Sequence, residues 1–339
     1  MTLPEVVLAV MWVGVTLYAI FAGADFGAGF WDLVAGGTRA GAAQRRLIEH
    51  SIGPVWEANH VWLIFVLVVL WTGFPTAFAT VMADLYVPLT IAAVGIILRG
   101  AGFAFRKAVN GLAWQYLFGT TFALSSVLTP FCLGAVAGAV ASGRVSRADR
   151  GGEPFSTWVT PTSALGGALA VATCAYLAAV FLAADADRQA DAALADAYRS
   201  RGLAAAVVAG LLAGAGIAVL AADAPTLFDG LTGRGLPLVV VGAGGAVTSM
   251  ALLRRRRFGA ARLAAVTAVA AVVWGWAAGQ YPEVLVGELT IAEAAGSRAT
   301  LTAMLASLAV GALLFVPPLV ALLTLHARGR LVDADSDRQ

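Results

Sequence analysis

Long apolar stretches recur along the whole 339-residue chain. About 20 apolar residues in a helix are enough to cross the hydrocarbon core of a membrane. We therefore expect nine membrane-spanning helices, over residues 6–34, 54–72, 80–106, 114–141, 160–184, 202–222, 236–253, 261–280 and 299–325. Charged residues make up only 12% of the chain, against about 25% in soluble domains. The sequence predicts an all-α polytopic membrane protein with one membrane domain, residues 1–339.

The connections between these stretches are short and exclude a soluble catalytic module or a phosphate-binding loop. The segment Met1–Glu5 lacks the basic region of a signal peptide, so we expect the first apolar stretch to stay as a helix. Cys132 and Cys174 lie inside apolar stretches and are interpreted as small core residues. A formal net charge of +2 gives no reason to expect a nucleic-acid partner.

Two connections carry more polar residues than the others. Asp185–Arg201 could form a short amphipathic surface helix. Tyr281–Ser297 contains Glu283, Glu288 and Glu293 and either covers the outer face or is an ordinary solvated loop.

Basic residues gather in alternate connections, after the first, third, fifth, seventh and ninth stretches. Under the positive-inside rule these connections are cytoplasmic. The amino end is then outside and the carboxyl end is cytoplasmic. Arg144, Arg147 and Arg150 conflict with this orientation, although Asp149 and Glu153 partly offset them.

Three ionisable residues are expected at one depth near the cytoplasmic face. Asp25 comes late in the first helix, Glu57 comes early in the second, and Arg99 comes late in the third. A charge inside a membrane helix costs roughly 2.5–3.5 kcal/mol on insertion scales and is a candidate for function. Such a group could take up protons from the cytoplasm; alternatively, a buried ion pair here would only fix helix packing.

Asn59 and His60 follow Glu57 at the mouth of the apolar run Leu63–Trp71. His60 could be a proton carrier or a haem ligand, but a hydrogen-bonded interior histidine is the commoner situation. His50 and His326 have no spacing to His60 that would clamp one metal ion. We therefore expect no metal or cofactor site on this chain.

Short motifs from the first three predicted helices closely resemble subunit II of the cytochrome bd quinol oxidases. They are Gly23–Gly27 (GADFG), Gly53–Ile64 (GPVWEANHVWLI), Leu85–Leu89 (LYVPL), Leu98–Gly100 (LRG) and Phe103–Arg106 (FAFR). Later motifs resemble the family's last external loop: Tyr281–Pro282, Leu289–Ala292 (LTIA) and Ala294–Ser297 (AAGS).

The resemblance implies a bacterial plasma-membrane complex that reduces oxygen to water with electrons from quinol. Subunit I would hold two haems b, haem d and the quinol-oxidising loop, while this chain would hold none of them. It implies two four-helix bundles, residues 1–141 and 160–280, with a ninth helix at 299–326, paired with subunit I. Small accessory subunits, lipid and quinone are further partners that the resemblance leaves open.

The resemblance also assigns roles in a cytoplasmic proton path. Glu57 would accept the proton, Asp25 would act as a second relay or organise water, and Arg99 would keep an acid ionised. Asn59 and His60 complete the predicted path. The chain departs from many members at its last helix, where Pro317–Pro318 is not followed by an aromatic and basic finish.

Two other functions fit the polar residues. A secondary transporter would place its substrate at Asp25, Glu57 and Arg99, but it predicts a matching polar half, and the sixth to eighth helices show none. A purely structural subunit would only cover its haem-bearing partner.

Overall fold

The computed structural model describes residues 1–327 except 37–39, 54–55, 110 and 147–153. Within these residues eight helical segments are long and apolar enough to cross a membrane. They are α1 (Leu3–Leu33), the α3–α4 segment (Trp56–Gly73), α6 (Tyr86–Ala108), α7 (Leu112–Ala141), α8 (Pro161–Arg188), α9 (Ala192–Asp223), α11 (Leu236–Arg254) and α12 (Phe258–Gln280). The prediction of a helical multi-pass membrane protein is confirmed. The ninth predicted span corresponds to α14 (Arg298–Ala327), whose described apolar part, Arg298–Leu314, is shorter.

The second predicted helix is interrupted rather than continuous. It consists of α3 (Trp56–Asn59) and α4 (Val61–Gly73), which meet at His60. The His60 amide bonds the Glu57 carbonyl at 3.2 Å, three residues back, so the chain tightens there before α4 begins.

The third predicted helix, 80–106, is also divided. It falls into α5 (Pro75–Asp84) and α6, with Leu85 between them at φ −111° and ψ 22°. Pro88 stands in the first turn of α6, where a missing amide hydrogen costs little. Helix α5 itself starts five residues before the predicted boundary because Pro75 occupies its first position.

Helices α2 (Ala40–Ile52) and α10 (Pro225–Thr232), like the short α13 (Ile291–Ala294) described below, have no counterpart in the predicted spans. Helix α2 is too short to cross a membrane and buries Leu47, Ile48 and Ile52 against the core. Helix α10 is shorter still and packs against α12.

The amphipathic surface helix predicted over Asp185–Arg201 is wrong. Helix α8 continues to Arg188, and α9 begins at Ala192 after a short turn. Asp191 caps α9 by accepting a hydrogen bond from the Leu194 amide at 2.9 Å. The polar residues of this segment therefore form the end of α8 and the start of α9, beyond the apolar parts of these two helices.

The segment Tyr281–Ser297 is folded onto the body of the protein. It contains the antiparallel hairpin β1 (Glu283–Leu285) and β2 (Leu289–Thr290), followed by α13 (Ile291–Ala294). Leu285 and Leu289 are buried in a cluster with apolar residues of α1 and α4. It is therefore not an ordinary solvated loop.

Two acids of this segment make local bonds, while Glu288 accepts a hydrogen bond from the Ser146 hydroxyl at 2.8 Å. Glu283 accepts from the Gly287 amide at 3.0 Å, and Glu293 completes a capping box at α13. The Tyr281 hydroxyl donates to Glu5 of α1 at 3.0 Å. That hydrogen bond and the adjacent negative charge raise the pKa of Tyr281.

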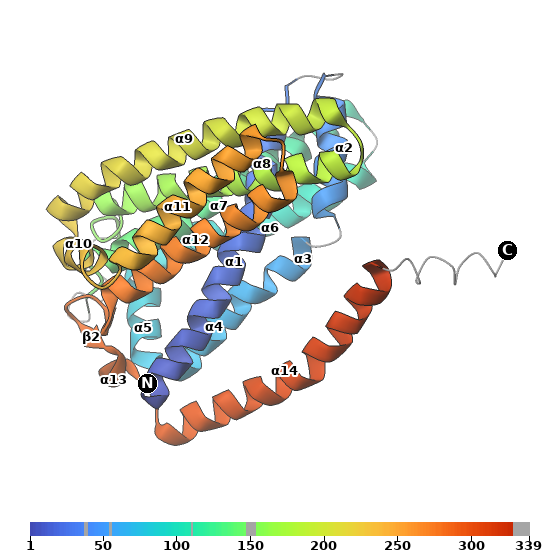
Figure 1. The fold of residues 1–339 in the computed structure, drawn as a ribbon. Coiled ribbons are helices and arrows are strands. Elements are labelled where there is room, and N and C mark those ends of the chain that lie inside the picture. The colour runs from blue at the N-terminus through green and yellow to red at the C-terminus, as the bar shows by residue number, and fades with distance from the viewer. Residues whose placement is uncertain (37–39, 54–55, 110, 147–153, 328–339) are drawn as a thin grey trace.

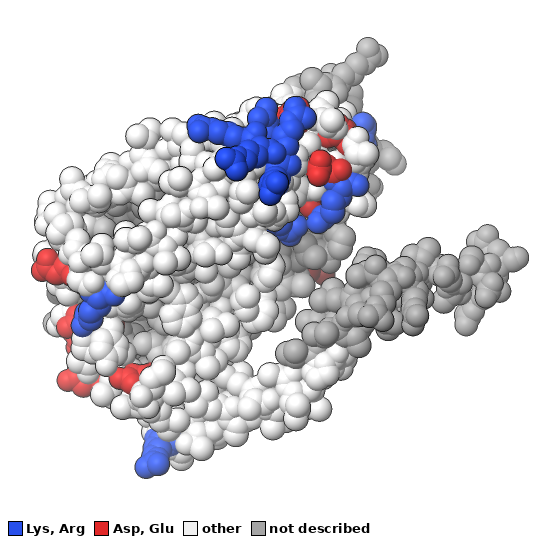
Figure 2. Space-filling view, viewed as in Figure 1, with Lys and Arg blue, Asp and Glu red and all other residues white. Residues whose placement is uncertain are grey.

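Helix α1 lies at the centre of the molecule, against α4, α7, α8 and α12 (Figure 1). Helix α14 lies apart from the body and contacts it through its first turns, where Leu301 and Met304 pack beside α1 and α4. Charged residues collect at the two ends of the helices, and on the visible face most arginines share one end (Figure 2). Between these ends the visible face carries few charged side chains.

Candidate functional site

A fully buried ion pair joins α1 to α6. The Arg99 Nη2 atom lies 2.8 Å from Asp25 Oδ1, and the two side chains are 1% and 2% exposed. Arg99 Nη2 also donates to the Asp25 carbonyl at 3.1 Å, and Arg99 Nε donates to Ser126 Oγ of α7 at 3.0 Å. The predicted proximity of Asp25 and Arg99 is confirmed, and three helices converge on one guanidinium.

Two aromatic rings enclose this guanidinium. The Arg99 Cζ atom is 5.0 Å from the ring centroids of both Phe26 and Phe122, within the range of a cation–π contact. Ser126 is held in place by its own bond to the Phe122 carbonyl at 2.6 Å. Asp25 Oδ2 has no hydrogen-bond partner among the described residues. One carboxylate oxygen is therefore bound by Arg99, and the other is buried without a bond to a described residue.

His60 and Asn59 lie next to the ion pair. The His60 ring centroid is 5.8 Å from that of Phe26 and 6.2 Å from that of Tyr18. His60 Nδ1 is buried without a hydrogen bond among the described residues. The expectation of a hydrogen-bonded interior histidine is therefore not met at this atom. Asn59 Nδ2 donates a long bond of 3.4 Å to the Phe21 carbonyl of α1.

Glu57 is the exception among the predicted site residues. It is exposed on this chain, and its carboxylate has no hydrogen bond or ion pair with a described residue. Its neighbour Trp56 packs on Phe103 with ring centroids 5.4 Å apart. The structure thus brings Asp25 and Arg99 into contact, places Asn59 and His60 beside them, and leaves Glu57 at the surface.

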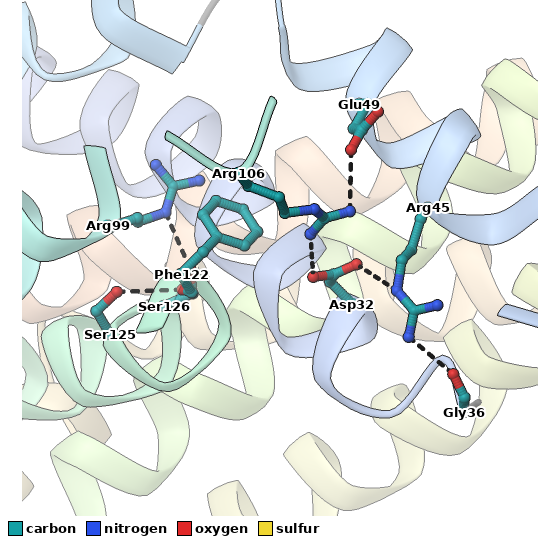
Figure 3. A network of polar contacts seen from close by, with 9 residues as sticks. All are labelled: Asp32, Gly36, Arg45, Glu49, Arg99, Arg106, Phe122, Ser125 and Ser126. Carbon is teal, nitrogen blue, oxygen red and sulfur yellow. Dashed lines mark hydrogen bonds and ion pairs between the residues drawn. The ribbon is translucent and has the colours of Figure 1, made fainter. Parts of the chain in front are cut away.

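A second ion-pair network lies seven residues along both helices (Figure 3). Asp32 of α1, 4% exposed at its side chain, binds Arg106 of α6 at 2.7 Å. Arg106 also binds Glu49 of α2 at 2.9 Å, and Arg45 of α2 reaches Asp32 at 3.4 Å. Arg45 further donates to the Gly36 carbonyl at 2.7 Å. This network ties α2 to the ends of α1 and α6.

The second network was missed by sequence reasoning although its signal was present. Asp25 and Asp32 are seven residues apart, and so are Arg99 and Arg106. Seven residues are nearly two helical turns and span about 10 Å. Two helices that run side by side in the same direction can therefore form both pairs at once. The matched spacing predicts two ion pairs between α1 and α6.

Candidate ligand side chains in the described residues do not gather into a metal site. Within the part of the chain that the structure describes, no group of three His, Cys, Asp or Glu residues could hold a metal. The His60 imidazole is flanked by the Tyr18 and Phe26 rings. The side chain of His326 lies outside the described residues.

A cavity of about 710 Å³ opens between α1, α4, α7 and α12. Its walls are mostly apolar, and Glu5, Arg234 and Tyr281 are among its few polar lining residues. Tyr18, which borders His60, also lines it. Such a lining suits a hydrocarbon tail better than a polar substrate.

The chain was found to be similar to a protein family, to a solved structure and to curated relatives. The model of the family "Cytochrome bd terminal oxidase subunit II" matches residues 3–325. A solved structure of bd oxidase from Geobacillus thermodenitrificans is similar with a TM-score of 0.76 and 26% identity, covering 96% of this chain and 99% of that one.

Curated relatives include cytochrome bd ubiquinol oxidase subunit 2 of Bacillus subtilis, 29% identical over 170 residues, which are 50% of this chain and 48% of the relative. Cytochrome bd-I ubiquinol oxidase subunit 2 of Escherichia coli K12 is 27% identical over 143 residues, 41% of this chain and 37% of the relative. The chain thus spans about half the length or less of these two relatives.

Proposed function

The chain belongs to the cytochrome bd terminal oxidase subunit II family, and from this premise we propose that it is the second subunit of a complex that oxidises quinol and reduces oxygen to water. The observation that carries the proposal is the family match over residues 3–325, supported by a structural likeness over 96% of the chain. The two haems b and haem d would belong to subunit I, where haem d would supply the iron that reduces oxygen. The family resemblance implies no haem on this chain, which would then support the haem-bearing partner.

The architecture proposed from the family is two four-helix bundles and a ninth helix. The first bundle would comprise residues 1–141 and the second 160–280, with α14 separate. Helix α8 contacts both α1 and α7 and would therefore join the two bundles. The complex would lie in a bacterial plasma membrane with the amino end of this chain outside. Lipid, quinone and small accessory subunits would be further partners.

The finer proposal is a proton path from the cytoplasm through this chain toward the partner. Glu57 is exposed and can exchange protons with water. Asp25 offers one unbonded carboxylate oxygen, and Arg99 holds the other. His60 presents an unbonded ring nitrogen nearby, and Asn59 anchors α3 to α1. Glu57 would take up the proton, Asp25 would relay it, and Arg99 would keep Asp25 ionised between transfers.

A structural role is the second candidate, and two observations favour it. The Arg99–Asp25 pair is almost fully excluded from solvent, and no described contact joins it to Glu57. A buried pair of this kind can specify how helices pack without transferring a proton.

Glu57→Gln, made in membranes that contain both subunits, separates these functions. The proton path predicts a drop of tenfold or more in quinol-driven oxygen consumption with an unchanged haem spectrum. Glu283→Gln, in the hairpin, is the matched control and should leave both readouts unchanged. Normal oxygen consumption in Glu57→Gln contradicts the path; loss of haem absorption instead favours the structural role. A preparation of the unaltered chain without co-purifying haem contradicts the oxidase assignment itself.

A further inference from the structure

Four consecutive arginines, Arg254 to Arg257, form the turn between α11 and α12. The turn is tight: the Arg257 amide bonds the Leu252 carbonyl at 2.9 Å, and Arg256 has a φ of 57°. Leu253 and Phe258 on either side are buried and anchor it. All four arginine side chains are exposed. Arg256 occupies a left-handed backbone position, where glycine would be less strained.

Nearby carboxylates do not neutralise this turn. Asp196 is shared by Arg256 at 2.6 Å and Arg199 at 3.2 Å. Asp185 is shared by Arg188 at 2.5 Å and Arg262 at 3.7 Å. Arg254, Arg255 and Arg257 have no ion pair with any described residue. Figure 2 shows the resulting basic surface at one end of the molecule.

An exposed apolar face of α11 leads directly to the arginines. Val240, Gly244, Val247, Ala251 and Arg254 follow one another at intervals of three or four residues and therefore share one side of the helix. Each of them is exposed, with Val240 62% and Val247 66% accessible. A Cβ at Gly244 would meet nothing within 4 Å, so no other part of the described chain covers the face there. Leu263 of α12, 71% exposed, lies two turns from the same arginines.

The length of this face matches one leaflet of a bilayer. From Val240 to Ala251 the helix rises about 16 Å at 1.5 Å per residue. Half of a hydrocarbon core is about 15 Å. Arg254 and its neighbours would then stand at the level of the lipid phosphates.

From this combination we propose that the α11–α12 turn binds an anionic phospholipid, with its phosphate on Arg254, Arg255 and Arg257 and an acyl chain along the α11 face. Charge complementarity selects an anionic headgroup, because a zwitterionic lipid brings its own cation beside the phosphate. If these arginines served only to orient the protein in the membrane by the positive-inside rule, positive charge in the connection would be enough. That role needs neither the exposed apolar face of α11 nor three arginines without an ion pair to a described residue. The proposal does not depend on the proton path.

The test uses the full complex in lipid nanodiscs with a photoactivatable acyl chain on phosphatidylglycerol or phosphatidylcholine. Cross-links are mapped by peptide mass spectrometry. With phosphatidylglycerol they should concentrate in residues 240–263, at least about fivefold above phosphatidylcholine. Equal labelling of these residues by the two lipids overturns the proposal. This comparison uses the unaltered complex, so the proposal can be contradicted even if the arginine variants do not fold.

Arg254→Gln combined with Arg255→Gln should abolish most of this preference. The control is Arg46→Gln combined with Arg298→Gln, which removes the same charge from two exposed arginines without described ion pairs. The control should keep the preference. If the turn variant also keeps it, or if both double variants lose it equally, the site is not at this turn.

Discussion

Arg99 is among the largest fully buried side chains of the protein, and its charge is tolerated because every side of the guanidinium is occupied. Asp25 and Ser126 accept its hydrogen bonds, while Phe26 and Phe122 cover it. Removing one partner of a buried pair is costly because the remaining charge loses its compensation. Replacing both partners with apolar residues is much less costly. The stability of single and double variants can therefore show what the ion pair contributes to the fold.

Asp25→Ala is expected to destabilise the protein by about 3–5 kcal/mol, because Arg99 is left charged and unpaired in a dry environment. The double variant Asp25→Leu with Arg99→Met should recover most of that loss. Thermal unfolding of the purified complex in detergent, followed with haem content, checks both. A double variant as unstable as the single one would show that the pair contributes more than charge compensation.

Sequence reasoning located this pair but not its surroundings. The types Asp and Arg, placed at one depth of two neighbouring helices, were sufficient to predict that Asp25 and Arg99 meet. Ser126 and Phe122 lie on α7, and neither residue type stands out in an apolar helix. Their contribution depends on the rotation of α7 about its axis, which apolar composition does not specify. Glu57 was predicted at the same depth, but depth alone does not determine which way a side chain faces.

At the scale of helices, the close approach of α1 and α8 depends on Gly27. A Cβ on Gly27 would lie 1.8 Å from the Cys174 carbonyl oxygen of α8. At Gly23, one turn earlier, the nearest atom is a flexible Leu177 methyl at 3.4 Å. Gly23 and Gly27 are four residues apart and form a small-residue face that allows close helix packing, yet only Gly27 is required by contact with backbone.

Gly27→Ala should therefore destabilise the complex by about 1–3 kcal/mol, because α1 and α8 must move apart. Gly23→Ala is the matched control, one turn away with the same change of size, and should be close to neutral. Thermal unfolding in detergent compares the two. Equal losses in both variants would show that the effect is not specific to the α1–α8 backbone contact.

Helix α2 is held by the ion-pair network and by its buried apolar side. A search for stretches of about 20 apolar residues cannot detect it, since it is short and amphipathic. Arg106 is the residue that joins it to α6, through Glu49, and to α1, through Asp32. The attachment of α2 is thus a property of three helices together.

Arg106→Gln should loosen α2 without unfolding the rest. Hydrogen bonds to charged groups contribute about 1.5–3 kcal/mol, so amide exchange in α2 should become about tenfold or more faster. Arg46→Gln, on the same helix but exposed and without a described ion pair, should leave exchange unchanged. Hydrogen exchange with mass spectrometry resolves the two cases. Unaltered exchange in Arg106→Gln would show that α2 is held by its apolar contacts alone.

For the whole molecule, the remaining conflict over orientation concerns Arg144. It forms two hydrogen bonds to Asp223 at the far end of α9, one of them at 3.0 Å. These bonds raise the pKa of Arg144, so the guanidinium remains charged, but a carboxylate compensates it. A compensated arginine on the outer side weakens the objection to the predicted orientation. Arg147 and Arg150 lie outside the described residues.

The predicted orientation can be tested at two positions at opposite ends of the helices. Ala292 of α13 is exposed beside the hairpin, and Gln189 is exposed in the turn after α8. Helix α8 alone has 28 residues, about 42 Å, which is the thickness of a bilayer with its headgroups.

Cys132 and Cys174 are only 2% and 8% exposed, so the unaltered chain should give little background with a thiol reagent. Ala292→Cys should react with a membrane-impermeant maleimide in intact cells, whereas Gln189→Cys should react only after permeabilisation. The reverse labelling pattern would place the arginine-rich end outside, contrary to the positive-inside rule, and would leave Glu57 without access to cytoplasmic protons.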